Sequence, residues 1–156
     1  MGRLALRRHA PPGSPAVLYA TCDDGVVLRL EEGAEGAWRT ETIYAGPQGP
    51  RGIAAGRFDA DPARETVATY GYGMRAQLLT RTEGGWKAED LFEDRDKGHW
   101  MCAAELDARN GTDEILLSGY GKRVVLLFRP PGYGLPGVAT DPRPDPLRGQ
   151  AAPGPR

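Results

Sequence analysis

Short stretches in which apolar and polar residues alternate, separated by turns rich in Gly and Asp, run through most of this chain. Four strands are expected in its middle, at Gly52–Phe58, Thr66–Tyr70, Arg75–Thr82 and Trp86–Phe92. Gly71-Tyr72-Gly73 supplies the positive-φ positions that a tight hairpin needs between the second and third of them. Because no segment keeps a 3.6-residue apolar period with helix caps, we expect an all-β protein.

The pattern recurs along the chain. Glu83–Lys87 matches Glu35–Arg39, and Phe58-Asp59-Ala60 matches Leu106-Asp107-Ala108, both at the same offset of 48 in residue number. Several independent matches at one offset without gaps are strong support for an internal repeat. Three copies are therefore predicted, at about 4–51, 52–99 and 100–147.

The outer copies are less regular than the central one. Strands are expected at Ala16–Cys22, Val26–Glu31 and Ala37–Tyr44 in the first copy, and at Trp100–Leu106, Glu114–Ser118 and Arg123–Phe128 in the third. Residues 1–15 form an N-terminal segment in which Leu4–Arg8 is a remnant first strand, and the third copy lacks a fourth strand. Eight of the 14 prolines lie in residues 130–156, which we interpret as a largely disordered Pro/Gly-rich tail, because proline cannot donate to a β-ladder.

Four short antiparallel strands in about 48 residues are typical of one blade of a β-propeller. A twisted four-stranded sheet has two apolar faces, which neighbouring blades cover. We therefore expect residues 16–129 to form a partial β-propeller of about three antiparallel four-stranded blades, with incomplete terminal blades. Trp38 and Trp86, at the starts of two fourth strands, are expected to pack between blades.

Two loops that follow first strands contain acidic residues at alternating positions. The segments 56–68 and 104–116 resemble the FG-GAP/VCBS repeat of integrin-type β-propellers, whose pattern is acid, hydrophobe, Asp or Asn, Gly, Asp, Gly, two variable residues and Asp before an apolar strand. In that family, alternate acids of this loop bind calcium, a cation that prefers oxygen ligands. By position, the resemblance implies as candidate ligands Asp59, Asp61, Glu65, Glu105, Asp107 and Asp113.

Each loop also departs from the family pattern. Arg57 and Arg109 each stand where the family has a ligand, and the first copy has Ser14-Pro15 with no match. A guanidinium can donate to carboxylates in fork geometry and so replace a cation. Our hypothesis is that the loops are metal-free remnants held by salt bridges, and that the protein has no cofactor. Bound calcium is the alternative.

The composition excludes several classes of protein. With 20 basic and 21 acidic residues the net charge is −1, so no overall field attracts nucleic acid. No apolar run approaches the length of a membrane-spanning helix, and no export signal begins this chain. The resembled family is often extracellular, but the compartment is not predicted. Cys22 and Cys102 are interpreted as small buried hydrophobes, with a disulfide as the alternative.

No catalytic motif is present. The two histidines, His9 and His99, fall in no HExxH pattern, and the chain lacks a nucleophile elbow, a P-loop and a GxGxxG segment. In an antiparallel meander, the hairpins between second and third strands and the connections between blades lie at one end, where ligands approach integrin-type propellers. The candidate ligand-binding face at this end comprises Asp24, Arg51, Tyr72, Arg75, His99, Tyr120, Lys122 and Arg123. Aromatic and basic side chains together suit a carboxylate-bearing glycan or an acidic peptide.

The sequence therefore predicts a non-catalytic β-propeller repeat module that binds a protein or a glycan. One alternative is the propeller segment of a polysaccharide-acting, lyase-like enzyme whose catalytic part lies elsewhere. A second is a truncated fragment without activity. Closed propellers have four to eight blades, so three cannot close. We expect either self-association or missing blades supplied by a longer chain.

Overall fold

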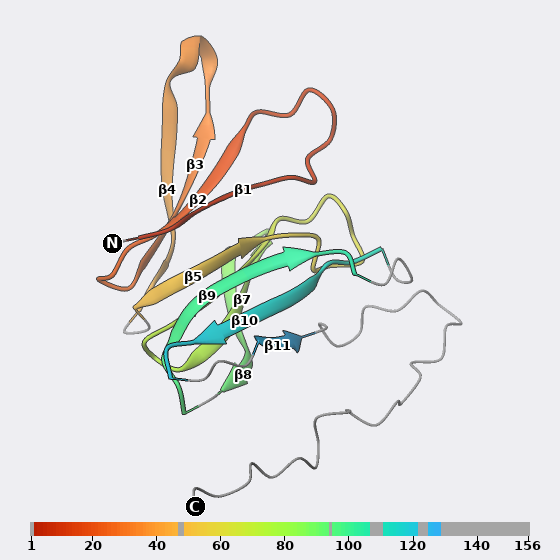
Figure 1. Ribbon diagram of the computed structural model, residues 1–156. Coiled ribbons are helices and arrows are strands. Elements are labelled where there is room, and N and C mark those ends of the chain that lie inside the picture. The colour runs from red at the N-terminus through yellow and green to blue at the C-terminus, as the bar shows by residue number, and fades with distance from the viewer. Residues whose placement is uncertain (1, 47–48, 94, 107–110, 122–124, 129–156) are drawn as a thin grey trace, which may run out of the picture.

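The computed structural model describes residues 2–46, 49–93, 95–106, 111–121 and 125–128, the last range for its backbone only. These residues form three antiparallel β-sheets and one short 3₁₀ turn, η1 (Ala34–Gly36), so the all-β prediction is confirmed (Figure 1). Within these ranges there is no helix of the length and apolarity needed to cross a membrane. The predicted tail at 130–156 lies outside the described residues.

Each sheet is a meander of strands that are consecutive in the chain. Sheet A contains β1 (Leu4–Leu6), β2 (Val17–Thr21), β3 (Val26–Glu32) and β4 (Trp38–Ala45). Sheet B contains β5 (Pro50–Ala55), β6 (Thr66–Gly71), β7 (Arg75–Thr82) and β8 (Gly85–Glu93). Sheet C contains β9 (Gly98–Ala104), β10 (Glu114–Gly119) and β11 (Val125–Phe128).

Most predicted strands lie where the pattern placed them, and the exceptions have local causes. The remnant first strand is real, because Leu4–Leu6 pairs with β2 and completes a four-stranded sheet A. The strand predicted to reach Phe58 ends earlier, at Ala55. Thr66 ends it: its hydroxyl donates to the carbonyl of Gly56 at 3.0 Å and accepts the backbone N–H of Phe58 at 3.2 Å, which closes the loop.

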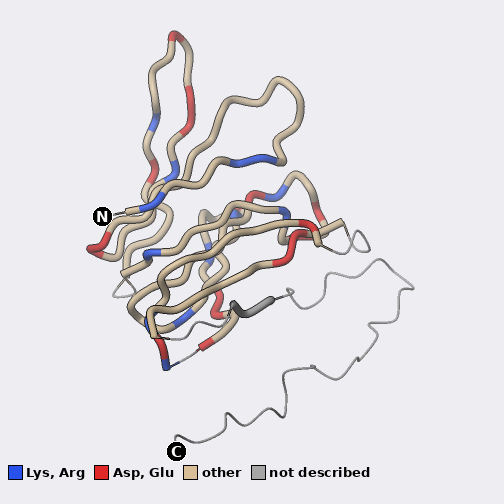
Figure 2. Tube along the Cα trace, in the orientation of Figure 1, with Lys and Arg blue, Asp and Glu red and all other residues tan. Residues whose placement is uncertain are grey.

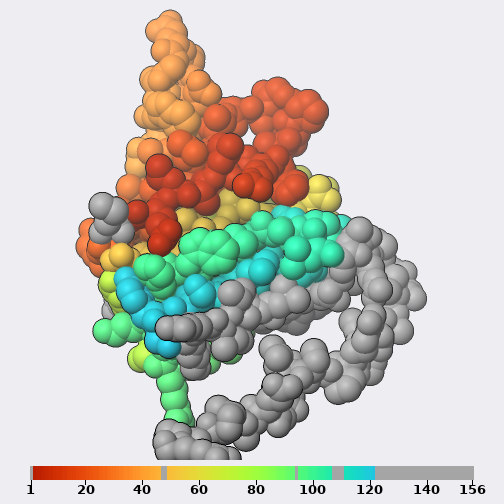
Figure 3. All heavy atoms as spheres, viewed as in Figure 1, coloured from red at the N-terminus to blue at the C-terminus, as the bar shows by residue number. Residues whose placement is uncertain are grey.

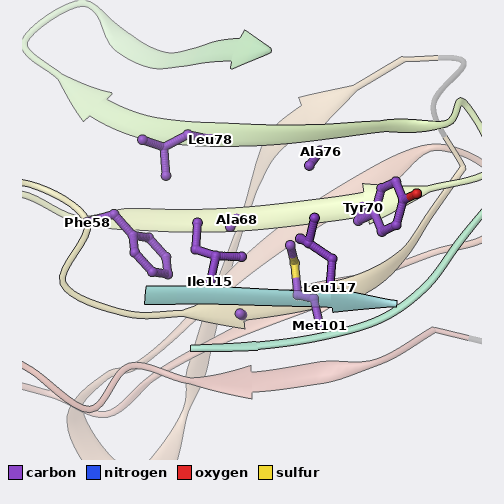
Figure 4. Packing of buried hydrophobic residues seen from close by; sticks show 9 residues of the cluster. Phe58, Ala68, Tyr70, Ala76, Leu78, Met101, Ile115 and Leu117 are labelled. Atoms are coloured by element: carbon purple, nitrogen blue, oxygen red, sulfur yellow. The ribbon is translucent and has the colours of Figure 1, made fainter. Parts of the chain in front are cut away.

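Sheet B lies between sheets A and C, and its strands β5 and β6 are the most buried, whereas β8 is largely exposed. Every residue of β6 is buried. One core cluster joins sheets B and C, and its buried members are Ala54, Phe58, Ala68, Tyr70, Ala76, Leu78, Met101, Ile115 and Leu117 (Figure 4). A second cluster joins sheets A and B through Val17, Tyr19, Val27, Ile43, Ile53, Val67 and Leu79. The alternation along each strand thus divides its side chains between two neighbouring layers.

The first strands of the three sheets lie side by side (Figure 1). A side chain at Gly98 would place its Cβ 2.5 Å from the backbone nitrogen of Gly71, and one at Gly52 would lie 3.2 Å from the nitrogen of Met101. The absence of a side chain at these two positions therefore allows β9 to lie close to both β5 and β6. A hollow of about 240 Å³ runs between β1, β5 and β9.

The cross-strand pairs correct the prediction of one ungapped register for all three copies. A row across sheet A reads Leu6–Leu18–Leu30, and the row in the same place in sheet B reads Ala55–Val67–Leu79. The offset between these two rows is 49 in residue number, where the prediction was 48. Sheets B and C do keep the offset of 48, since Ala55–Val67 corresponds to Ala103–Ile115.

The extra residue lies in the connection between β3 and β4. Trp38 pairs with Glu32, and Trp86 pairs with Arg81, so the fourth strands return to an offset of 48. The sheet A connection is thus one residue longer than its counterpart in sheet B. It contains η1, where Glu35 adopts a positive φ of 61°. A sequence comparison anchored on the tryptophans therefore gives the wrong offset for the three preceding strands.

The two aligned tryptophans have different surroundings. Trp86 packs between sheets as predicted, edge-to-face with Tyr19 of sheet A at a ring-centroid distance of 6.3 Å. Its indole N–H donates to Glu41 of the same neighbouring sheet at 3.1 Å. Trp38 is 44% exposed, because no described sheet covers the side of sheet A on which it lies.

Candidate functional site

Aromatic and basic side chains gather at the hairpin end of sheets B and C. We call Arg51, Tyr72, Lys97, His99 and Tyr120 the hairpin-end cluster. Tyr72 lies in the turn between β6 and β7, and Tyr120 directly follows β10. Backbone hydrogen bonds fix both turns, from the N–H of Tyr72 to the carbonyl of Gly49 and from the N–H of Tyr120 to that of Lys97.

The rings of the cluster are in direct contact. Tyr72 and Tyr120 stack with centroids 6.2 Å apart and planes inclined by 25°, and the His99 ring lies 4.2 Å from that of Tyr120. Two cations lie against Tyr72: the Arg51 guanidinium carbon is 5.3 Å from the ring centroid, and the Lys97 ammonium is 5.6 Å from it. Cation–π contacts of this kind orient long basic side chains on a surface.

Hydrogen bonds tie the cluster together. Arg51 Nη1 donates to the Tyr72 hydroxyl at 2.7 Å, and the same nitrogen lies 3.4 Å from a carboxylate oxygen of Asp23. A hydrogen bond with Tyr120, together with partial burial, raises the pKa of Tyr72 above its ordinary value, so this hydroxyl stays protonated at neutral pH. In the described part of the chain, His99 Nδ1 and Arg51 Nε are buried without a hydrogen-bond partner.

Four residues of the predicted binding face are members of this cluster: Arg51, Tyr72, His99 and Tyr120. Arg75 instead reaches Asp90 and Glu93 on β8, at 3.3 and 3.9 Å. Asp24 accepts the backbone N–H of Val26 and stabilises the β2–β3 turn. The predicted Lys122 and Arg123 lie outside the described residues.

The sequence-based prediction omitted Lys97. This residue lies in the connection between β8 and β9, a segment that the meander topology places at the hairpin end. The charge of Lys97 and its position in that connection were both readable from the sequence. Its neighbour Asp96 accepts the backbone N–H of Gly121 at 3.0 and 3.1 Å, so the turn after β10 is held close to this connection.

The acidic loop between β5 and β6 lies at the opposite end of sheet B. Figure 2 shows acidic and basic residues close together in it. Asp59 accepts the backbone N–H of Asp61, and Asp61 accepts that of Ala63, both at 2.9 Å, as in successive Asx turns. Arg64 Nη1 donates to the second carboxylate oxygen of Asp59 at 2.8 Å. These two acids are therefore bonded within their own loop.

Glu65, the last acid of this loop, is 8% exposed and binds arginines of both sheets. Arg29 on β3 holds it in a fork, with Nε to Oε2 at 2.8 Å and Nη2 to Oε1 at 2.9 Å. Arg7 Nη1 donates to Oε1 at 2.9 Å, and Arg81 Nη1 lies 3.8 Å from Oε2. The Tyr19 hydroxyl also points to Oε2, at 3.5 Å. The carboxylate thus joins sheet A to sheet B.

This arrangement sets the charge states of the group. Burial alone would raise the pKa of Glu65, but the hydrogen bonds and charge of Arg29, then the charges of Arg7 and Arg81, lower it below the ordinary value. Burial and the charge of Glu65 raise the pKa of Tyr19. Arg29 also bonds Glu31, so its positive charge is shared between two acids.

The corresponding loop of sheet C is described only in part. Asp113 Oδ2 accepts the backbone N–H of Arg57 at 2.7 Å and lies 3.2 Å from His9 Nε2. Arg57 Nη1 donates to the carbonyl of Gly111 at 3.1 Å, so this arginine bridges the two loops. Glu105 is exposed, and Asp107 falls outside the described residues.

Most carboxylate oxygens of the described loop acids have partners within the protein. In the part of the chain that the structure describes, no three His, Cys, Asp or Glu residues are grouped to hold a metal ion. Both oxygens of Asp59 and Glu65, and one oxygen each of Asp61 and Asp113, face guanidinium, imidazole or backbone donors. These donors occupy the positions from which a cation would be bound.

We expect calorimetric titration of the full chain with Ca²⁺ to give no heat of binding in the micromolar range, because the loop acids already have internal partners. The matched variant is Arg64→Ala, which frees one oxygen of Asp59. It is expected to leave micromolar binding absent, since Glu65 stays bonded to Arg29. Micromolar binding by the wild type would contradict the remnant hypothesis.

No model of a known protein family matches the chain, and no curated protein matches it.

Proposed function

We propose that this chain is a non-catalytic β-propeller repeat module that binds a carboxylate-bearing ligand, on a protein or a glycan, through the hairpin-end cluster. The propeller interpretation is supported by three consecutive meanders stacked face to face, with their first strands side by side. It is also supported by the resemblance of the β5–β6 loop to the FG-GAP/VCBS pattern. The non-catalytic part rests on the sequence, which contains no recognisable catalytic motif.

The cluster is the observation that carries the proposal. Three separate turns and two first strands, distant in sequence, bring two cations and three aromatic rings to one end of the sheets. Tyr72 is 36% exposed and Tyr120 is 52% exposed, so both rings present part of their surface to solvent. Binding residues are commonly placed on loops that a rigid scaffold positions.

The chemistry of the cluster favours an anionic ligand. The Arg51 guanidinium has the planar donor geometry that matches a carboxylate. Lys97, which lies against the same Tyr72 ring, adds a second positive charge. The exposed tyrosine rings supply apolar surface with little loss of side-chain freedom on binding. The ligand carboxylate would compete with Asp23 for Arg51, and this exposed contact of 3.4 Å is weak.

Direct binding measurements test this function. The full chain is titrated with polygalacturonate, a carboxylate glycan, and with poly-glutamate, an acidic peptide, at low and high salt. We expect saturable binding of one of the two that weakens with salt. The triple variant Tyr72→Ala, His99→Ala and Tyr120→Ala should bind that ligand at least about tenfold more weakly, because aromatic anchors contribute most of the energy at such sites.

Arg75→Ala is the matched control, since this basic residue of the same sheet pairs with β8 instead. It should leave the affinity unchanged. Failure of the wild type to bind either polymer, or equal affinity of the triple variant, would contradict the proposal.

A further inference from the structure

Sheet A has an apolar face that no described residue covers. Leu4 is 69% exposed and Leu6 is 53% exposed, and Leu18, Leu28 and Leu30 are partly exposed. None of these leucines belongs to either core cluster. Sheet A is the end layer of the stack in Figure 1, and its β3–β4 end projects beyond the other sheets in Figure 3.

The register identifies what kind of face this is. The row Leu6–Leu18–Leu30 of sheet A corresponds to Ala55–Val67–Leu79 of sheet B and to Ala103–Ile115 of sheet C. The row of sheet B packs on sheet A, and Ala103 and Ile115 pack on sheet B. Sheets B and C thus use this row to contact the sheet that precedes them. Only in sheet A does the row have no described partner.

The central residue of this row in sheet A is Leu18, and its counterparts show what the row does in the other sheets. Val67 and Ile115, which correspond to Leu18, are both fully buried. Trp38 lies on the same uncovered side and is 44% exposed, whereas its counterpart Trp86 is partly buried against sheet A. The uncovered face therefore carries side chains of the type that the two internal contacts bury.

Sheet C presents the complementary kind of face. The side of β9 and β10 that points away from sheet B carries Trp100, 38% exposed, the partly exposed Cys102, Ala104 and Leu116, and the fully buried Glu114. These positions correspond to those with which sheet B receives sheet C, since Cys102 and Leu116 are the repeat counterparts of Ala54 and Ala68. One copy of the chain thus has one face of each type at its two ends.

We propose that the uncovered face of sheet A binds the outer face of sheet C of a second copy, and that two copies close a six-sheet ring. This inference rests on the propeller interpretation given under the proposed function. Propellers close with four to eight blades, and six is the one multiple of three in that range. A two-fold axis makes the two contacts between copies equivalent, so neither apolar end face is left exposed to solvent.

The oligomeric state of the full chain tests the proposal. One copy has a mass of 16.8 kDa, and we expect light scattering to give twice that value for the wild type. Leu18→Lys, at the centre of the sheet A face, and Trp100→Lys, on the sheet C face, should each give the mass of one copy. Ala34→Lys, in the exposed connection between β3 and β4, introduces the same charge outside both faces and should remain a dimer.

Circular dichroism checks that each variant keeps its β-structure, and Leu6→Lys replaces Leu18→Lys if the latter does not fold. A monomeric wild type would overturn the inference. So would a dimeric Trp100→Lys with a monomeric Leu18→Lys, which indicates that two copies of sheet A bind each other. Mass is measured without ligand, so its outcome is independent of the polymer titrations that test the hairpin-end cluster.

Discussion

Replacing Glu65 by alanine is expected to lower the free energy of unfolding by about 3 kcal/mol. The carboxylate is buried between sheets A and B, where Arg29 holds it in a fork and Arg7 donates a third hydrogen bond. Among the described acids, the substitution leaves the buried Arg29 guanidinium with Glu31 and, at 4.0 Å, the partly exposed Glu41, and a buried charge that loses its main partner is costly. Urea titration followed by tryptophan fluorescence measures the change, since Trp86 lies in this interface.

Two further variants separate the buried charge from a general loss of contacts. Glu41→Ala removes an acid at the exposed edge of the same network and should cost at most about 1 kcal/mol. Glu65→Leu combined with Arg29→Met should recover most of the stability lost in Glu65→Ala, because a buried pair can often be replaced by apolar side chains. A double variant no more stable than Glu65→Ala would show that the unpaired charge is not the cause.

The contribution of Glu65 should disappear in acid. Its pKa is lower in the folded protein than the ordinary value of about 4.3 in an unfolded chain. Its stabilising effect is therefore complete above that pH and is lost as the pH falls through the folded pKa. We expect the stability difference between wild type and Glu65→Gln to be constant from pH 7 to about pH 5, and to shrink below about pH 4.

Phe58→Ala is expected to cost about 3–5 kcal/mol, the usual range for removing a buried aromatic ring. Phe58 is fully buried and belongs to the cluster between sheets B and C (Figure 4). The backbone at Gly56 lies so close that a Cβ there would be 2.7 Å from the Phe58 ring, so the loop closes tightly over this side chain. Thermal unfolding measured by calorimetry gives the change.

The repeat provides a matched control for this substitution. Leu106 is the counterpart of Phe58 in the next copy and has the same loop position, yet it is 55% exposed. In a single copy, Leu106→Ala should therefore change the stability by less than about 1 kcal/mol, so both substitutions are compared in the monomeric background of Trp100→Lys. Similar costs at the two positions in that background would show that burial of the Phe58 ring between sheets B and C is not the cause.

The sequence predicted much of the fold, because the signals were local. Alternation along the central copy gave the positions of β6, β7 and β8 to within one residue. Gly71-Tyr72-Gly73 marked the place of the hairpin between the first two, but the prediction that it supplies the positive φ was wrong, because the positive φ of 60° in this turn belongs to Met74. The expected meander topology placed Arg51, Tyr72, His99 and Tyr120 at one end of the sheets. It also places Lys97 there, but the prediction omitted this residue.

What the sequence did not predict depends on contacts between sheets. Nothing local indicates that Glu65 binds Arg29, which is 36 residues away, instead of its own loop. The one-residue difference in the connection before Trp38 was hidden for a physical reason. A turn can absorb an extra residue through positive φ angles, as at Glu35 and Gly36, while the tryptophan that follows the turn stays aligned with its counterpart in the next copy.

The layered order of the sheets has a consequence for how the protein loses structure. Each layer is made from one continuous stretch of chain and is held only by its nearest neighbours, so stability is approximately a sum over layers and the interfaces between them. Sheet B contributes to two such interfaces, whereas sheets A and C each contribute to one within a single copy. In a single copy, amide protons of β6 should therefore exchange with solvent most slowly, and opening should begin at sheets A and C.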